Sequence, residues 1–480
     1  NVGALNSDQV SVLSTAQLST LGTGQVKSIT TSAVAAMTTT QVAALSTTQV
    51  AALTTVQMAA LTANEVKTFS TTQVQALGST QINALTNANV SALTTGQVSA
   101  LTTGQVNALT TSAVSALGTA QVQALSTGQV QAITTTNVTA LSTTQVAALT
   151  TGQVSALSTS QVVALETSDI AALSTTQVGA LTTAQVNVLS TDKVAALSTG
   201  QVAVLTTAQV QALTTANVAS LSTSQLQVLS SDQVAAFSTA QVSALTTTEA
   251  ATLSAGQARA LTTAQVQVLN TSNLQALKLA SVEAMTSTQL QVLSTTQLNA
   301  LETEDFASLT DTQIKALTTA QVQALTTSAI TSLSGDQVSK FTTAQVAVVT
   351  TTNVAALSAD QVAAMTTAQV GTLSTAQVQV IGTSAVAAMT TTQVATLSTA
   401  QVAVLTTGQV SVLTANEVKA LSTGQVQALS TSQVNALTNA NVSALTTGQV
   451  NALTTAQVNA LTSSAVTALG TAQVQALSTG

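Results

Sequence analysis

The residues with the clearest chemical potential are four carboxylates in the stretch "ETEDFASLTD", namely Glu302, Glu304, Asp305 and Asp311. Several carboxylate oxygens held close together can bind a hard cation such as Ca²⁺. Acids near the start of a helix are also favoured by the helix dipole without any ligand. We interpret this stretch as a locally solvated surface whose acids are stabilised by a helix dipole, and we predict no metal site.

Other residue types argue against catalysis. The chain has no His and no Cys, so the usual general base, thiol nucleophile and zinc ligands are missing. Its four Phe residues and all five Met residues occupy positions that elsewhere in the repeat hold Val or Leu, which predicts core packing and not a ligand pocket; the Phe residues are Phe69, Phe237, Phe306 and Phe341. We therefore expect no enzyme, no catalytic residue and no cofactor.

The charges are few and scattered. The sequence has 8 Lys and Arg and 15 Asp and Glu in 480 residues, for a net charge of -7. Nucleic-acid binding needs clustered basic residues, so it is not expected. Polar residues interrupt every apolar run well before the roughly 18 residues that a membrane span needs. The absence of Cys fits either side of the membrane, but the acidic, Lys-poor and Thr-rich composition favours an extracellular or cell-surface location.

Internal repeats make up the whole chain. The unit is an octad of the form [S/T]-[T/S/A]-x-[Q/N/E]-V-x-A-L, and its frame holds from Val2 to Leu477 without an insertion, which gives 60 octads. Residues 1–128 also match residues 353–480, so a second period of 352 residues lies over the first. We predict a single uninterrupted array over residues 1–480 with no separate domains. Because the chain starts and stops inside an octad, we expect it to be part of a longer array.

Each octad carries the signals that begin a helix. A Ser or Thr followed three residues later by Gln or Glu is a capping box, and the preceding Leu with the following Val matches a hydrophobic staple. Fifty of the sixty cap positions are Ser or Thr; the others are Asn6, Asn270, five Gly, Glu166, Glu302 and Lys278. Glu and Lys are poor caps, so the last three predict weak links.

A continuous helix does not fit this spacing. Eight residues turn a helix through about 800°, so the Val and Leu pair would drift around the helix and never form a stripe. The sequence therefore predicts an all-α solenoid, or superhelix, of very short helices, one per 8-residue repeat, for which we assume two octads per coil. A β-solenoid stays open as the alternative, because Thr, Val and Gln suit stacked strands.

Two further variations stand out within this frame. Lys340 occupies a position that is small in nearly every octad and is the clearest local misfit. Lys67 and Lys419 follow Glu65 and Glu417 at matching places in the long period, and residues two apart on a helix do not face each other. We interpret these pairs as surface variation.

Units such as "LTTAQVQAL" and "LSTTQVAAL" resemble the octapeptide arrays of very large bacterial surface or secreted proteins, which are often described as adhesin-like. The resemblance implies a non-catalytic structural role as an extracellular fibre, stalk or filament, with neighbouring repeats or chains as partners. The alternative is a surface-binding module in which a flat, Thr-rich array binds ice or a polysaccharide, which goes with the β-solenoid. The Leu-Thr-x-x-Gln-Val start is also similar to the DNA-reading repeats of plant-pathogen effectors. Their basic contacts and variable base-reading pair are missing here, so we expect no nucleic-acid partner.

Overall fold

Each octad forms one short α-helix. The computed structural model describes residues 1–477, and within them it contains the 3-10 helix η1 (Val2–Ala4) and 59 α-helices, numbered α1 to α59. Each α-helix begins one residue after its cap and runs for four to six residues; examples are α5 (Thr39–Ala43), α6 (Thr47–Ala52), α7 (Thr55–Ala60) and α8 (Ala63–Lys67). No strand occurs in this described part of the chain. The all-α prediction is confirmed and the β-solenoid alternative is wrong.

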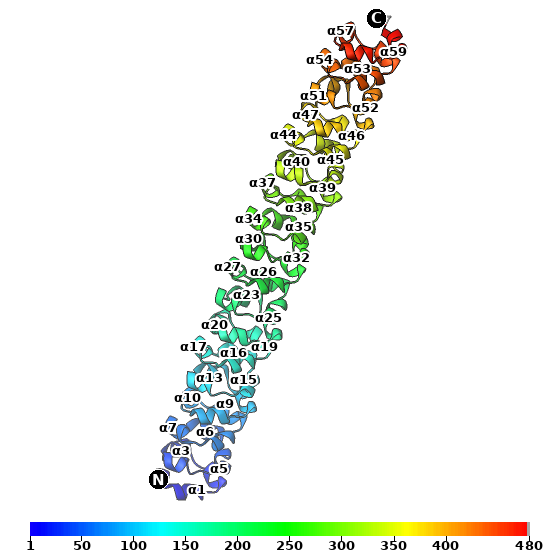
Figure 1. Cartoon of the computed structure of the whole chain (residues 1–480). Coiled ribbons are helices and arrows are strands. Elements are labelled where there is room, and N and C mark those ends of the chain that lie inside the picture. The colour runs from blue at the N-terminus through cyan, green and yellow to red at the C-terminus, as the bar shows by residue number, and fades with distance from the viewer. Residues whose placement is uncertain (478–480) are drawn as a thin grey trace. The chain divides into compact units, whose positions relative to one another are not determined.

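The helices belong to two compact units, Asn1–Ala244 and Leu245–Gly480. Each unit is a helical solenoid in its own right, with its helices stacked in coils (Figure 1). Both units are built from the same octad, so a description of one junction between helices applies to either unit. The prediction of one array without separate domains stays a prediction.

The cap is the device that interrupts the helix every eight residues. In α6 the cap Ser46 has an extended backbone (φ -68°, ψ 160°), and its hydroxyl accepts a hydrogen bond from the Gln49 N–H. The same helix ends at Leu53, which is extended as well (φ -56°, ψ 135°). The chain thus passes from one helix to the next through an extended Leu and an extended Ser or Thr. We call each such junction a corner.

One coil contains about three octads. Helix α6 packs against α9 (Thr71–Ala76) and against α3 (Thr23–Ser28), and contacts between a helix and the third helix along the chain recur throughout both units. The assumption of two octads per coil is therefore wrong. The physical reason lies in the corner. Its two extended residues turn the chain so that about three helices complete one coil, and the size of this turn cannot be inferred from the residues of a single octad.

The Val and Leu positions fill the centre of each coil. Val50 is fully buried and Leu53 is 5% exposed. The Phe and Met residues are buried as well, the most exposed of them at 5%, so the prediction that they belong to the core is confirmed. Because every helix is too short to be stable alone, its stability depends on this packing between coils.

Fragment length tests this dependence. We expect residues 94–117, which form one coil, to be unfolded, and residues 94–141 and 94–189 to gain helical signal per residue in far-UV circular dichroism. A single coil has no neighbour on which to bury Val and Leu, whereas longer fragments share that surface between coils. Equal helicity per residue in all three fragments would contradict the stacking argument.

Candidate functional site

The third residue of most helices is polar and yet buried. Of the 59 such positions from Gln9 to Gln473, 41 are Gln. In the first coil Gln9, Gln17 and Gln25 are exposed, whereas the Gln residues at this position from Gln41 onward are buried. The difference indicates that the coil preceding it along the chain covers this side chain.

Gln185 shows what the buried amide does. Its Oε1 accepts a hydrogen bond from the N–H of the cap Thr182 at 2.7 Å, and the Thr182 hydroxyl accepts one from the Gln185 N–H at 3.2 Å. Its Nε2 donates to the carbonyl oxygens of Val154 and Leu157 at 2.9 and 2.6 Å. Those two carbonyls lie 31 and 28 residues earlier, at the corner that ends α19 (Thr151–Ala156).

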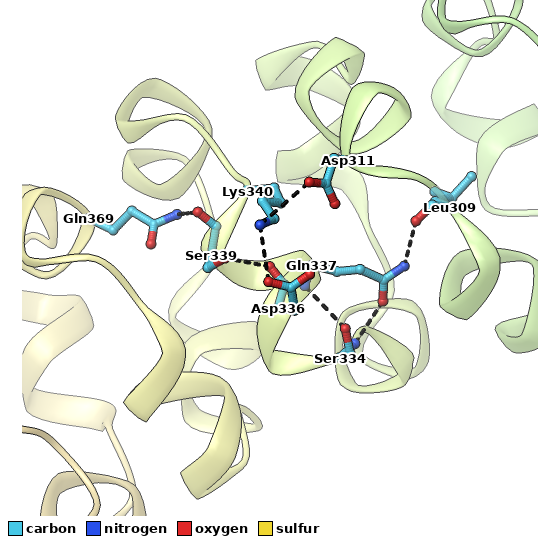
Figure 2. Close-up of polar contacts among 8 residues, drawn as sticks. All are labelled: Leu309, Asp311, Ser334, Asp336, Gln337, Ser339, Lys340 and Gln369. Carbon is cyan, nitrogen blue, oxygen red and sulfur yellow. Dashed lines mark hydrogen bonds and ion pairs between the residues drawn. The ribbon is translucent and has the colours of Figure 1, made fainter.

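One side chain therefore satisfies two corners. Helix starts leave N–H groups and helix ends leave carbonyls without partners inside the helix, and Gln185 serves both kinds. Figure 2 shows the same arrangement at Gln337, which pairs with the cap Ser334 and donates to the Leu309 carbonyl at 2.8 Å. The predicted capping box is confirmed, and the bond to the neighbouring coil is the part that the sequence interpretation missed.

The departures from Gln each keep only part of this function. Asn89 donates to the Leu61 carbonyl at 3.0 Å, but Asn is one methylene shorter. Glu65 accepts from the Thr62 N–H at 2.6 Å, but an ionised carboxylate has no hydrogen to donate. Lys193 donates to the Val163 carbonyl at 2.7 Å and has no acceptor for its own cap. Only Gln has both the length and the donor–acceptor pair that the corner needs.

A signal for the missed bond was present in the sequence. A capping box accepts Glu as well as Gln, yet only three of these 59 positions are Glu and 41 are Gln. A strong preference for the amide indicates that its NH₂ group is used.

The three caps that the sequence predicts to be poor lack a capping side-chain bond, and whether they are weak links stays a prediction. Glu166, Glu302 and Lys278 make no side-chain hydrogen bond as caps. Helices still begin after them, and the N–H of Glu166 donates to the Asp169 carboxylate at 2.9 Å. Burial of the third position and packing between coils thus compensate for a poor cap.

The acidic stretch divides into buried and exposed parts. Asp305 is the third residue of α38 (Thr303–Ser308), is 5% exposed and accepts from the Glu302 N–H at 2.9 Å. Its interpretation as part of a solvated surface is wrong, because the third position of the helix points into the corner. Glu302 and Glu304 are exposed. Within residues 1–477 no group of three or more acidic, His or Cys side chains is placed to hold a metal ion.

Burial sets the electrostatics of the charged corners. Desolvation raises the pKa of Asp305, and the charges of Glu302 and Glu304 add to the rise while the Glu302 N–H opposes it. Desolvation also raises the pKa of Asp169 and lowers the pKa of Lys193, one coil further along the chain. The opposite charges of Asp169 and Lys193 reduce both pKa shifts.

Lys340, the predicted misfit, is accommodated by two acids. Its Nζ lies 3.1 Å from the Asp336 carboxylate and 3.4 Å from that of Asp311 (Figure 2). The hydrogen bond to Asp336 and the charge of Asp311 raise the pKa of Lys340. Asp311 thus takes part in a surface ion pair between neighbouring coils, which explains its place without a cation.

Family comparison identifies the repeat. A family model described as the ALTTAQ repeat matches residues 21–247, 298–335 and 338–479 in overlapping or adjoining segments. The chain belongs to the ALTTAQ repeat family. A search of curated proteins finds no significant match to the chain. The letters that name the ALTTAQ repeat occur here at Ala180 to Gln185 and span one whole corner, from the end of one helix to the amide that closes the next.

The part of the chain between the ALTTAQ matches, residues 248–297, has altered corners. It contains Lys278 as a cap and Ser281 at the third position, and the Ser281 hydroxyl donates to the Leu253 carbonyl at 2.7 Å. Helices continue through it at the same spacing. The fold of the ALTTAQ repeat thus tolerates a change of corner residue if one bond to the neighbouring coil remains. No helix in residues 1–477 has the length and apolar character to cross a membrane.

Substitutions at Gln185 distinguish the contribution of the cap bond from that of the bonds to the neighbouring coil. We expect Gln185→Asn to lower the free energy of unfolding by about 1 kcal/mol and Gln185→Leu by about 2–4 kcal/mol, because Leu leaves a buried N–H and buried carbonyls unpaired. Gln185→Glu keeps the cap bond and should cost at least as much as Leu at neutral pH. Urea unfolding followed by circular dichroism measures the differences. Gln131→Leu, at an exposed position, is the control and should change little.

The raised pKa of Asp305 predicts a pH dependence. The folded-state pKa lies above the ordinary value of 3.8, so folding favours the protonated acid and the ionised form opposes it. Stability should therefore rise as pH falls from neutral through the folded pKa toward 3.8. Asp305→Asn should remove this gain and stabilise the protein by about 1 kcal/mol at neutral pH. Thermal unfolding at several pH values checks it, with exposed Asp360→Asn as control; an unchanged pH profile in Asp305→Asn would refute the assignment.

Proposed function

We propose that the array is a non-catalytic structural element, an extracellular or cell-surface fibre, stalk or filament whose length is set by the number of coils. The observation that carries this proposal is the Gln corner. The same side chain donates to the Leu carbonyl 28 residues earlier at coil after coil, as at Gln49, Gln185 and Gln449. The recurring polar group of the octad is thus used internally to join coils.

Two further features support a spacer. The cap hydroxyls of the array accept hydrogen bonds from backbone N–H groups of their own helices, as Thr94 and Thr446 do. Their orientation is therefore set by the helix and not by an external ligand. The Thr-rich binding face considered as the alternative requires strand spacing, and residues 1–477 contain no strand. Scattered charges and the resemblance to arrays of bacterial surface proteins support a location outside the cell.

Deletions of whole coils test the spacer. Removing residues 94–165 or residues 366–437 takes out nine octads each, from different units. We expect both deletions to shorten the particle equally in electron micrographs of the purified protein, because a spacer depends on the number of coils and not on their identity. A deletion that abolished a binding activity at one position alone would favour a binding module instead.

The location is tested separately. Antibodies against the array should label intact cells that produce the protein as strongly as permeabilised ones. A marker confined to the cell interior should be labelled only after permeabilisation. Labelling of the array only after permeabilisation would overturn the proposed location.

A further inference from the structure

The departures from Gln at the third position follow a rhythm of their own. They are Ala33, Glu65, Asn89, Ala113, Asn137, Asp169, Lys193, Asn217, Glu249, Asn273, Ser281, Asp305, Ala329, Asn353, Ala385, Glu417, Asn441 and Ala465. Apart from Ser281, every step from one departure to the next is three or four octads. The sixteen steps from Ala33 to Ala465 cover 54 octads, so the average step is just under three and a half octads.

This average matches the distance along the chain between stacked neighbours. The Ser91 hydroxyl donates to the Ala116 carbonyl, 25 residues away, which is slightly more than three octads. The Gln105 amide reaches carbonyls 28 and 31 residues away, which are three and a half and almost four octads. The average step lies between these separations, so a residue one such step further on lies next to the first one, a coil apart. Successive departures that are three octads apart lie on helices that pack against each other, as α8 does against α11 (Asn87–Ala92).

Figure 1 agrees for each unit taken by itself. In the first unit the helices labelled along the left edge include α7, α10 (Ser79–Asn83), α17 (Thr135–Val138), α20 (Thr159–Ala164) and α27 (Thr215–Ala219). In the second unit they include α34 (Thr271–Gln275), α37 (Thr295–Leu298), α44 (Thr351–Ala355), α51 (Thr407–Ser411), α54 (Thr431–Asn435) and α57 (Thr455–Asn459). Each of these helices either carries a departure at its third position or leads directly into the helix that does. We call the line of corners that carry these departures the seam.

Bonds between coils are fewer at the corners of the seam, except at Lys193, which donates two. A Gln corner donates two or three hydrogen bonds to the neighbouring coil, as Gln129 does. Asn137 donates one, to the Leu109 carbonyl. The Ala113 side chain has no polar atom, and the Glu65 carboxylate has no donor when it is ionised. Apart from Ser281, the corners of the other edges keep Gln from the second coil onward, so nearly every coil has one weak edge beside strong ones.

Folding alone does not require this alignment. The cap N–H and the helix-end carbonyls are the same at all corners of a coil, so a departure would cost the same at any of them. Departures tolerated only for folding would spread around the edges. A single edge indicates that the position of the weak bonds matters to the solenoid as a whole.

Two of the three buried polar atoms that lack a partner in residues 1–477 belong to departures from Gln. Within residues 1–477 the buried side-chain atoms left without a hydrogen bond are Glu249 Oε1, Asn273 Oδ1 and Asn299 Oδ1. Glu249 and Asn273 are seam residues. Asn299 lies in the octad before Asp305 and lines a groove of about 550 Å³ with Glu302, Glu304 and Ala329. The departures thus hold two of the three unpaired atoms.

We propose that the seam is a built-in line of flexibility, along which the coils of each unit separate while the Gln edges act as the hinge. Because a unit with one weak edge bends in one plane, the solenoid is compliant in one direction and stiff in the others. The proposal deepens the structural function proposed above, since directional bending is a property of a fibre. It is tested on the purified protein and does not depend on the location of the protein.

Pairs of labels on the full chain measure the bending. The chain has no Cys, so Lys67→Cys with Thr139→Cys places two spin labels along the seam, nine octads apart. Gln75→Cys with Ala147→Cys gives the matched pair, also nine octads apart, beside corners that are Gln, and all four positions are exposed. In double electron–electron resonance we expect the distance distribution of the seam pair to be at least twofold broader than that of the matched pair.

Two variants decide between the seam and a local effect. The first variant restores Gln at four seam corners through Glu65→Gln, Asn89→Gln, Ala113→Gln and Asn137→Gln. In this variant the distance distribution of the seam pair should narrow to the width measured for the matched pair. The second variant also moves the departures by one octad, through Gln73→Glu, Gln97→Asn, Gln121→Ala and Gln145→Asn. In this variant the matched pair should show the broad distance distribution. Circular dichroism confirms that both variants fold. Equal widths in the starting protein, or a broad seam pair after restoration, would overturn the proposal.

Discussion

The hydrogen bonds of the Gln amide are the interaction on which the rest of the structure depends. They join a side chain at the start of one helix to carbonyls 28 and 31 residues earlier, so they fix both the local turn and the distance around a coil. A coil of two octads would place those carbonyls out of reach. The same residue thus specifies the helix start and the stacking, and this agreement between local and long-range preference favours one structure over its competitors.

The sequence predicted what is contained in one octad. The cap, the box Gln, the end of the helix at the Ala-Leu pair and the burial of Phe306 or Met58 all follow from residues within eight positions of each other, and the structure confirms them. The number of octads per coil was not predictable in the same way, because it depends on the angle of the corner and on which helices pack. Asp305 was misassigned for a related reason: its position in the octad decides its burial, whereas the neighbouring acids suggested a solvated surface.

Information about the coil was nevertheless present in the sequence. The steps of three octads from Glu65 to Asn89 and from Asn89 to Ala113 connect residues on helices that stack. Interpreting that pattern requires knowing that the third position faces the neighbouring coil, which the pattern alone does not state. Variation at a buried, periodic position thus records the packing distance more directly than the recurring residues do, since the recurring residues are the same at every corner.

The choice of an amide over a carboxylate also explains how such an array can be long. Each corner buries one polar side chain, so a repeat that used Glu would place an ionised group in the interior at every octad. The cost of burying a charge without a close counterion is large, and like charges would accumulate with every added coil. The raised pKa of Asp305 and of Asp169 shows this cost at single sites. A neutral amide makes the same cap bond without charge, so the stability per coil does not fall as coils are added, and the array can grow by repetition of one eight-residue unit.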